Sequence, residues 1–138
     1  MPFNEETRGR AIKSALNMPE YWVGLSTTAV NPNGTGATEP SPLTGYARVK
    51  SINNTTNWSE PTDGEIHNLT QIKFNTFIAD AGVATHCFIA ATSTGLPQIS
   101  SKFVDASGNP NPRPLSADAT LFLNPNDLSF SAKNPTSI

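Results

Sequence analysis

The two histidines and the single cysteine have the widest chemical range of any side chains in this chain. His86 and Cys87 are adjacent in an apolar segment, and His67 lies well before them. Neighbouring residues of a strand point to opposite faces, so His86 and Cys87 cannot bind one metal ion together. A zinc site needs three or four such ligands. The sequence therefore predicts no metal site, a buried structural thiol at Cys87 and a hydrogen-bonded core or edge histidine at His86.

A second candidate for ion chemistry is the segment Asp105–Asn109, which carries side-chain oxygens at alternate positions, as the start of a calcium loop does. Pro110 stands where the sharp-turn glycine of an EF-hand belongs, and Ser116 stands where the bidentate glutamate belongs. The EF-hand pattern therefore fails. Two interpretations remain open, a looser calcium site and an Asx turn in a proline-rich connection.

Catalytic signatures are absent from the sequence. It contains neither a Gly-x-Ser-x-Gly elbow nor a catalytic-cysteine motif. The glycines at Gly34 and Gly36 are followed by prolines rather than by a helix that could bind phosphate. Acidic residues could meet in space but are sparse in the expected strands. We therefore expect no enzyme, no catalytic residues and no cofactor.

The amino-acid composition and net charge exclude some classes of partner. Of 138 residues, 36% are hydrophobic and only 14% are charged, below the roughly 25% charged residues of an average domain. A net charge of −2 without a basic patch argues against nucleic acid as a partner. No apolar run approaches the roughly 20 residues that span a bilayer, and no signal-peptide core is present. We expect no membrane partner and folding in a cytoplasm.

The elements that would position these side chains are mostly short strands. Alternating and β-branched residues predict them, with turn residues between. In order, the sequence predicts a strand at 21–26, a loop at 31–45, a strand at 46–52, a turn at 62–64, a strand at 66–75 with a bulge near Thr70, a hairpin of 83–90 with 99–104, a proline-rich loop at 105–114, and short strands at 120–123 and 128–132. This pattern predicts a single all-β domain over 1–138, a β-sandwich or jelly roll of about seven to eight short antiparallel strands.

One N-terminal helix or arm is expected at 4–17, with Asn4 as its cap and Pro19 just past its end. Ile12 and Leu16 form a narrow apolar face. A helix with so small a face must dock to persist, either on its own sheet or on another protein.

Several segments, in order along about residues 10 to 132, resemble a family of small tailed-bacteriophage virion proteins that are described as tail-fibre-like or as capsid cement or decoration proteins. The matching segments are 21–27 (Tyr-Trp-Val-Gly-Leu-Ser-Thr), 35–41 (Thr-Gly-Ala-Thr-Glu-Pro-Ser), 45–49 (Gly-Tyr-Ala-Arg-Val), 57–59 (Asn-Trp-Ser), 82–86 and 115–128. The chain departs from the family pattern at Gly95-Leu96-Pro97, in the longer loop at 105–114 and in the N-terminal helix.

The resemblance implies a structural protein of the virion that stabilises the phage head by bridging neighbouring major capsid proteins. It implies a homo-oligomer, a dimer or trimer, made in the host cytoplasm and bound to the outer capsid surface. The alternative is a tail or head fibre module that recognises a host-surface glycan, with Trp58 among polar residues as a sugar-binding aromatic. Candidate interface residues are Ile12, Leu16, Trp22, Thr38, Glu39, Pro40, Trp58, Pro110 and Pro112.

The loop between the strands at 21–26 and 46–52 is the leading candidate for contact with the shell or a neighbouring copy, because long loops in compact domains are often functional. Replacing 35–42 with a short Gly/Ser linker is therefore expected to weaken capsid binding and to leave the fold nearly intact.

Overall fold

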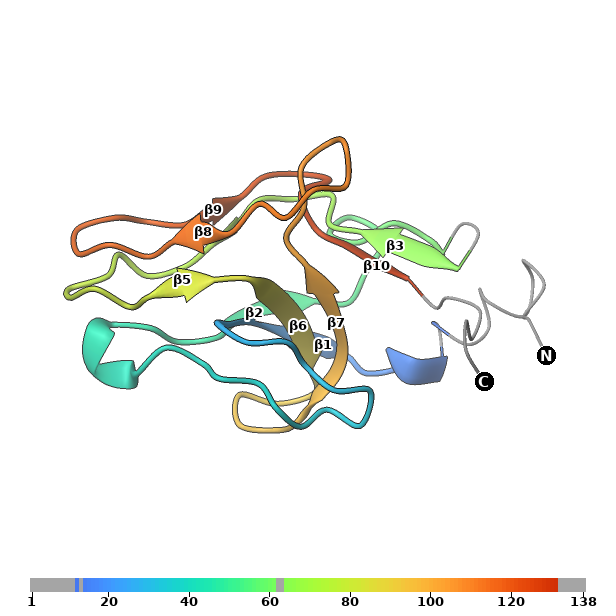
Figure 1. Cartoon of the computed structure of the whole chain (residues 1–138). Helices are drawn as coiled ribbons and strands as arrows, with labels where there is room; N and C mark the ends of the chain where they lie inside the picture. The colour runs from blue at the N-terminus through green and yellow to red at the C-terminus, as the bar shows by residue number, and fades with distance from the viewer. Residues whose placement is uncertain (1–11, 13, 62–63, 132–138) are drawn as a thin grey trace.

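The computed structural model describes residues 12, 14–61 and 64–131 and is built almost entirely of short antiparallel strands (Figure 1). The described elements are β1 (Glu20–Ser26), the 3-10 turn η1 (Pro42–Thr44), β2 (Val49–Ile52), β3 (Glu65–His67), β4 (Ile72–Lys73), β5 (Val83–Ala84), β6 (His86–Ala90), β7 (Pro97–Lys102), β8 (Arg113–Pro114), β9 (Phe122–Leu123) and β10 (Ser129–Ser131). The expected all-β class is confirmed.

The largest sheet has the order β2-β1-β6-β7, with every neighbouring pair antiparallel. Side chains of β1 and β6 alternate between the two faces of this sheet. Val23 and Ile89 are cross-strand partners on the face that packs in the core. A register shift between Ile89 and Ala90 bends β6 against β7. The expected hairpin of 83–90 with 99–104 is observed only in part, between β6 and β7 at 86–90 and 97–102, because Val83 and Ala84 form β5 and pair with β8 instead.

Three short strand pairs complete the fold: β3 with β10, β4 with β9, and β5 with β8. Figure 1 shows β3, β10, β8 and β9 above the four-stranded sheet. Apolar side chains from the pairs, such as Ile66, Phe130 and Leu123, join those of β1 and β6 in one buried core. The pairs therefore cover the apolar face of the large sheet, and burial of that face is what holds the chain together.

The opposite face of the large sheet is also partly buried, around Gly24 and Phe88. A Cβ atom at Gly24 would lie 2.3 Å from Cζ of Phe88. The Arg48 guanidinium carbon lies 4.9 Å from the centre of the same ring. Only a residue without a side chain fits under this ring, which explains the glycine inside a strand.

Several expected boundaries differ from the observed ones. The strand expected at 66–75 is split into β3 and β4, because the side chain of Asn68 turns inward and bonds to backbone groups of 70, 123, 124 and 128. The strand expected at 46–52 begins only at Val49. Most of the expected helix at 4–17 and most of the turn at 62–64 lie outside the described residues; within them, the Leu16 N–H donates to the Ile12 carbonyl at 3.0 Å, the spacing of one helical turn.

Candidate functional site

The long connection between β1 and β2 is fixed by one arginine. The guanidinium of Arg48 donates from Nε and Nη2 to the two carboxylate oxygens of Glu39, at 2.9 and 3.0 Å. Its Nη1 donates to the carbonyls of Thr92 and Gly95, at 2.9 and 2.8 Å. Only 7% of the Arg48 side chain is exposed. Arg48 therefore ties the loop to the turn between β6 and β7, and we call Glu39 with Arg48 the loop brace.

Tyr46 connects the loop brace to the sheet. Its hydroxyl donates to Oε1 of Glu39 at 2.7 Å and accepts from the Leu25 N–H of β1 at 3.0 Å. Burial raises the pKa of Tyr46 well above its usual range. Burial alone would also raise the pKa of Glu39, but hydrogen bonds from Arg48 and Tyr46 and the charge of Arg48 bring it below its usual range. Glu39 is therefore held as a carboxylate.

The outer part of the loop closes on itself through backbone and hydroxyl groups. The Ser26 hydroxyl at the end of β1 donates to the Thr28 carbonyl at 2.6 Å and accepts from the Thr38 N–H at 3.0 Å. The Thr27 N–H donates to the Thr38 carbonyl, and the Asn31 N–H donates to the Thr35 carbonyl. These hydrogen bonds join the two halves of the loop to each other, so the loop is ordered before it contacts any partner.

Beside the loop brace lies a groove of about 410 Å³. Its apolar lining comes from Trp22 of β1, Pro40, Pro42 and Ala47, and Ser93 also lines it. Trp22 is half-buried, and Pro40 is buried. Aromatic side chains in such partly exposed positions are frequent anchors of protein interfaces.

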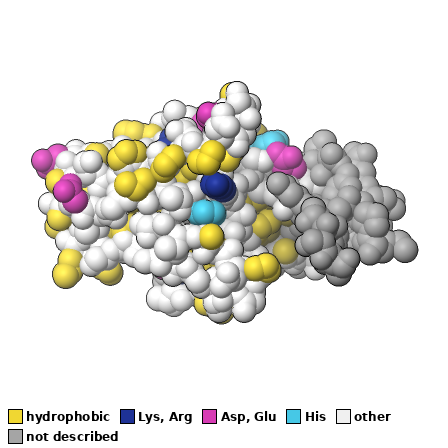
Figure 2. All heavy atoms as spheres, viewed as in Figure 1, with side chains coloured by type: hydrophobic (Ala, Val, Ile, Leu, Met, Phe, Trp, Pro, Cys, Tyr) yellow, Lys and Arg dark blue, Asp and Glu magenta, His cyan; other side chains and the backbone are white. Residues whose placement is uncertain are grey.

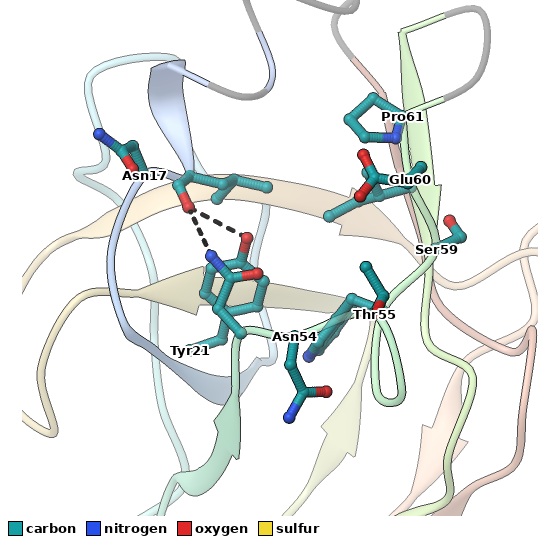
Figure 3. Close-up of a pocket in the computed structure, with 11 residues that line it drawn as sticks. Asn17, Tyr21, Asn54, Thr55, Ser59, Glu60 and Pro61 are labelled. Atoms are coloured by element: carbon teal, nitrogen blue, oxygen red, sulfur yellow. Dashed lines mark hydrogen bonds between the residues drawn. The ribbon is translucent and has the colours of Figure 1, made fainter.

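A second hollow, of about 310 Å³, lies between the residues before β1 and the connection from β2 to β3. Figure 3 shows Tyr21 and Asn54 on one side of this hollow and Glu60 and Pro61 on the other. The Tyr21 hydroxyl donates to the Leu16 carbonyl at 3.0 Å, and burial raises the pKa of Tyr21 to about 12. This hydroxyl therefore serves the fold, because it satisfies a carbonyl where the chain enters β1.

Trp58 lines the same hollow but is only 3% exposed. Its indole N–H donates to the Ser51 hydroxyl at 2.9 Å, and its ring packs edge-on against Tyr21 with centres 5.2 Å apart. A sugar stacks on the open face of an aromatic ring, and Trp58 offers little of its ring to a ligand.

The residues first considered for metal or ion binding are buried or hydrogen-bonded within the fold. Cys87 is a free buried thiol, and burial raises its pKa to about 12. His86 is half-buried, with Nδ1 at 2.8 Å from the Thr85 hydroxyl. Asp105 Oδ1 accepts from the Ser107 and Asn109 N–H groups, which is an Asx turn. Within the described ranges no group of three or more His, Cys, Asp or Glu could hold a metal ion.

The nine candidate interface residues fall into three places. Ile12, Leu16 and Trp58 are in the buried core, where they contact other parts of the same chain. Trp22, Thr38, Glu39 and Pro40 are brought together around the loop brace, with Thr38 exposed. Pro110 and Pro112 are exposed in the segment just before β8.

Two features of these surfaces were not predicted from the sequence. The sequence predicted Arg48 only as a strand residue, and the one signal for its ion pair was a glutamate, Glu39, nine residues before it. Val83 and Val104 were placed in strands with no surface role, yet both are about half exposed and stand opposite Pro114 and Pro110.

Comparison with protein families finds a match to the model described as "Podophage GP4 fiber I protein gp80", over residues 9–107. The matched range contains the loop brace, Trp22 and the β6–β7 hairpin. The chain belongs to this family. No curated protein and no solved structure matches it.

Membership in the gp80 fibre family makes the chain a structural protein of a bacteriophage, which confirms the coarser part of the sequence resemblance. The match ends inside the proline-rich loop, so β8, β9 and β10 lie beyond it. In the part of the chain that the structure describes, no helix is long and apolar enough to cross a membrane.

Proposed function

We propose that this gp80-family chain is a non-enzymatic fibre protein of the podophage virion that contacts a neighbouring virion protein through the braced loop between β1 and β2. The loop brace carries the proposal. A loop of this length that is already ordered loses little conformational entropy when a partner covers it. The family description supports a fibre, and the groove at Trp22 supports a protein contact rather than a reaction.

The capsid cement role expected from the sequence uses the same loop on a different partner, the major capsid protein. It differs from the fibre role in location and copy number, because a cement protein covers the head lattice. The glycan-binding alternative depended on Trp58, and the burial of that ring gives it no support.

The experiment that tests the fibre role is localisation on purified virions, by cryo-electron microscopy together with gold-labelled antibody against this chain. We expect label on fibres at low copy number. Label spread evenly over the head shell would overturn the fibre role and favour the cement role.

A test of the loop contact requires a variant in which the loop brace stays intact. Leu43 in η1 is 85% exposed, so Leu43→Asp should preserve the fold and reduce incorporation into virions by roughly tenfold if a desolvated contact is lost. Leu69→Asp, an exposed leucine away from the loop, is the matched control and should incorporate normally. Equal incorporation of both variants, each normalised to its soluble level, would show that the loop is not the contact.

The linker replacement of 35–42 is unsuitable for this purpose. It removes Glu39 and leaves the buried Arg48 guanidinium without its carboxylate, so the fold itself would be weakened. This revises the expectation that such a replacement leaves the fold nearly intact.

A further inference from the structure

Arg113 of β8 is a half-buried cation without a counter-charge. Its guanidinium carbon lies 5.2 Å from the centre of the Phe103 ring. Its Nε atom is buried and has no hydrogen-bond partner. Among the described residues, no carboxylate forms an ion pair with the Arg113 side chain. Removing an arginine from water is costly unless an acceptor pairs with it, so a guanidinium in this state lacks a partner that the chain itself does not supply.

Strand alternation sets the direction of the Arg113 side chain. In the segment 110–114, exposed prolines occupy every second position, so Arg113 between them points to the other face. Its cross-strand partner on β5 is the fully buried Ala84. Burial raises the pKa of the Cys87 thiol, and the positive charge of Arg113 partly opposes that rise. The guanidinium therefore lies at the margin of the core, where opposite charges attract more strongly than they do in water.

The guanidinium of Arg113 is held in place before any ligand arrives. The Phe103 ring beneath it is only 4% exposed. The Phe103 N–H donates to the Thr85 carbonyl, and the Phe103 carbonyl accepts from the Asn111 N–H, both at 2.9 Å. Stacking on a ring occupies the flat face of a guanidinium and leaves its N–H edge free. No described residue accepts from the Nη atoms, which are open to solvent.

The loop brace shows which ligand such an arginine takes. Arg48 also stacks on a phenylalanine, Phe88, at 4.9 Å, and its N–H edge binds the two oxygens of the Glu39 carboxylate. Arg113 has the ring but not the carboxylate. A site for phosphate usually gathers several cations or backbone N–H groups, and on the face seen in Figure 2 basic side chains stand singly among uncharged ones. One fixed cation matches one carboxylate.

We propose that Arg113 binds the carboxylate of an aspartate or glutamate side chain on a neighbouring virion protein. The incoming carboxylate gives Arg113 the ion pair that Arg48 has within the chain, and partly buried pairs of this kind fix the register of an interface. The contact is separate from the loop between β1 and β2 and stands whether or not that loop binds a partner. It lies on β8, beyond the range of the family match.

The first test is NMR of the arginine Nε–H signals of the full chain, titrated with acetate and, separately, with phosphate at constant ionic strength. We expect the Arg113 signal, identified by its loss in Arg113→Lys, to shift progressively over roughly 10 to 300 mM acetate. The Arg48 signal should stay in place, because its Nε already donates to Glu39. No shift of the Arg113 signal would overturn the site, and a larger response to phosphate would overturn the choice of a carboxylate.

The second test is incorporation of Arg113→Met into virions. Loss of an unpaired, half-buried charge should leave the melting temperature unchanged or raise it, yet incorporation should fall by roughly tenfold or more. Lys73→Met is the matched control and should incorporate normally, because Lys73 also lies over a phenylalanine ring, with Nζ 5.9 Å from the centre of Phe122.

Normal incorporation of a folded Arg113→Met chain, or an equal loss in Lys73→Met, would overturn the proposal. If Arg113→Met does not fold, the NMR titration decides. Loss of incorporation in Arg113→Met together with normal incorporation of Leu43→Asp would exclude the loop contact and support this one, so the two proposals can fail separately.

Discussion

The carboxylate of Glu39 and the guanidinium of Arg48 face each other in a two-pronged ion pair, with N–O distances of 2.9 and 3.0 Å. The pair joins a long polar loop to a sheet and to the turn of a different hairpin.

Glu39→Gln should lower the free energy of unfolding by roughly 2 to 4 kcal/mol, because it leaves the buried Arg48 charge without a counter-charge. Chemical denaturation of the purified variant measures this. Glu20→Gln is the control, since Glu20 pairs with Lys50 at 3.7 Å on the surface, and it should cost less than about 0.5 kcal/mol. Equal losses for the two variants would mean that the loop brace adds no stability.

The same carboxylate should make stability depend on pH. The pKa of Glu39 is lower in the folded chain than its usual value, so the unfolded chain takes up a proton first as the pH falls. The stability that Glu39 contributes is complete above about pH 5 and is lost as the pH falls through the folded pKa. Denaturation curves at a series of acidic pH values should show this decline. The decline should be shallower in Glu39→Gln; parallel curves would contradict the assignment.

Gly24→Ala should destabilise the chain by roughly 1 to 3 kcal/mol, because the new methyl group would collide with the Phe88 ring held under Arg48. The cause can be isolated in a double-mutant cycle with Phe88→Leu, which removes the ring. The alanine should cost less in the Phe88→Leu background. The same cost in both backgrounds would exclude the ring as the reason for the glycine.

Asn68→Asp should be severely destabilising, by roughly 3 kcal/mol or more, although the two side chains have the same shape. The buried Asn68 amide donates to the carbonyls of Thr70 and Asn124 at 3.0 and 2.9 Å, and aspartate cannot donate there when it is ionised. Asn54→Asp is the matched control, because exposed Asn54 uses only its oxygen, to accept from Thr56 and Asn57. Thermal melting of the two variants should differ sharply.

The strands that pack on the core could be predicted from the sequence, because their signal is local. The two central strands of the large sheet were predicted from the alternation of Tyr21, Val23 and Leu25 and from the apolar run from Cys87 to Ala90. The hairpin that follows was predicted from its turn residues. The buried Cys87 thiol was also predicted correctly, and the Asx turn at Asp105 was one of the two interpretations left open, because each depends on a few neighbouring residues.

The polar contacts that shape the surface could not be predicted in the same way. Arg48 reaches the carbonyls of Thr92 and Gly95, more than forty positions away, and no local pattern encodes that approach. Asn68 splits an expected strand because its partners come from the far end of the chain. The exposed apolar pairs Val83–Pro114 and Val104–Pro110 depend on strand registers that only the folded chain reveals.

The alternation of prolines before and within β8 also governs what this chain does when many copies are crowded together. The N–H groups of Asn111 and Leu115 are directed inward to other parts of the chain, so the outward-facing positions are those of Pro110, Pro112 and Pro114, which have no N–H to donate. A strand from another molecule therefore finds no hydrogen-bond donors along this edge and cannot extend the sheet. Contact along this margin is confined to side chains, which limits uncontrolled sheet growth before the virion is assembled.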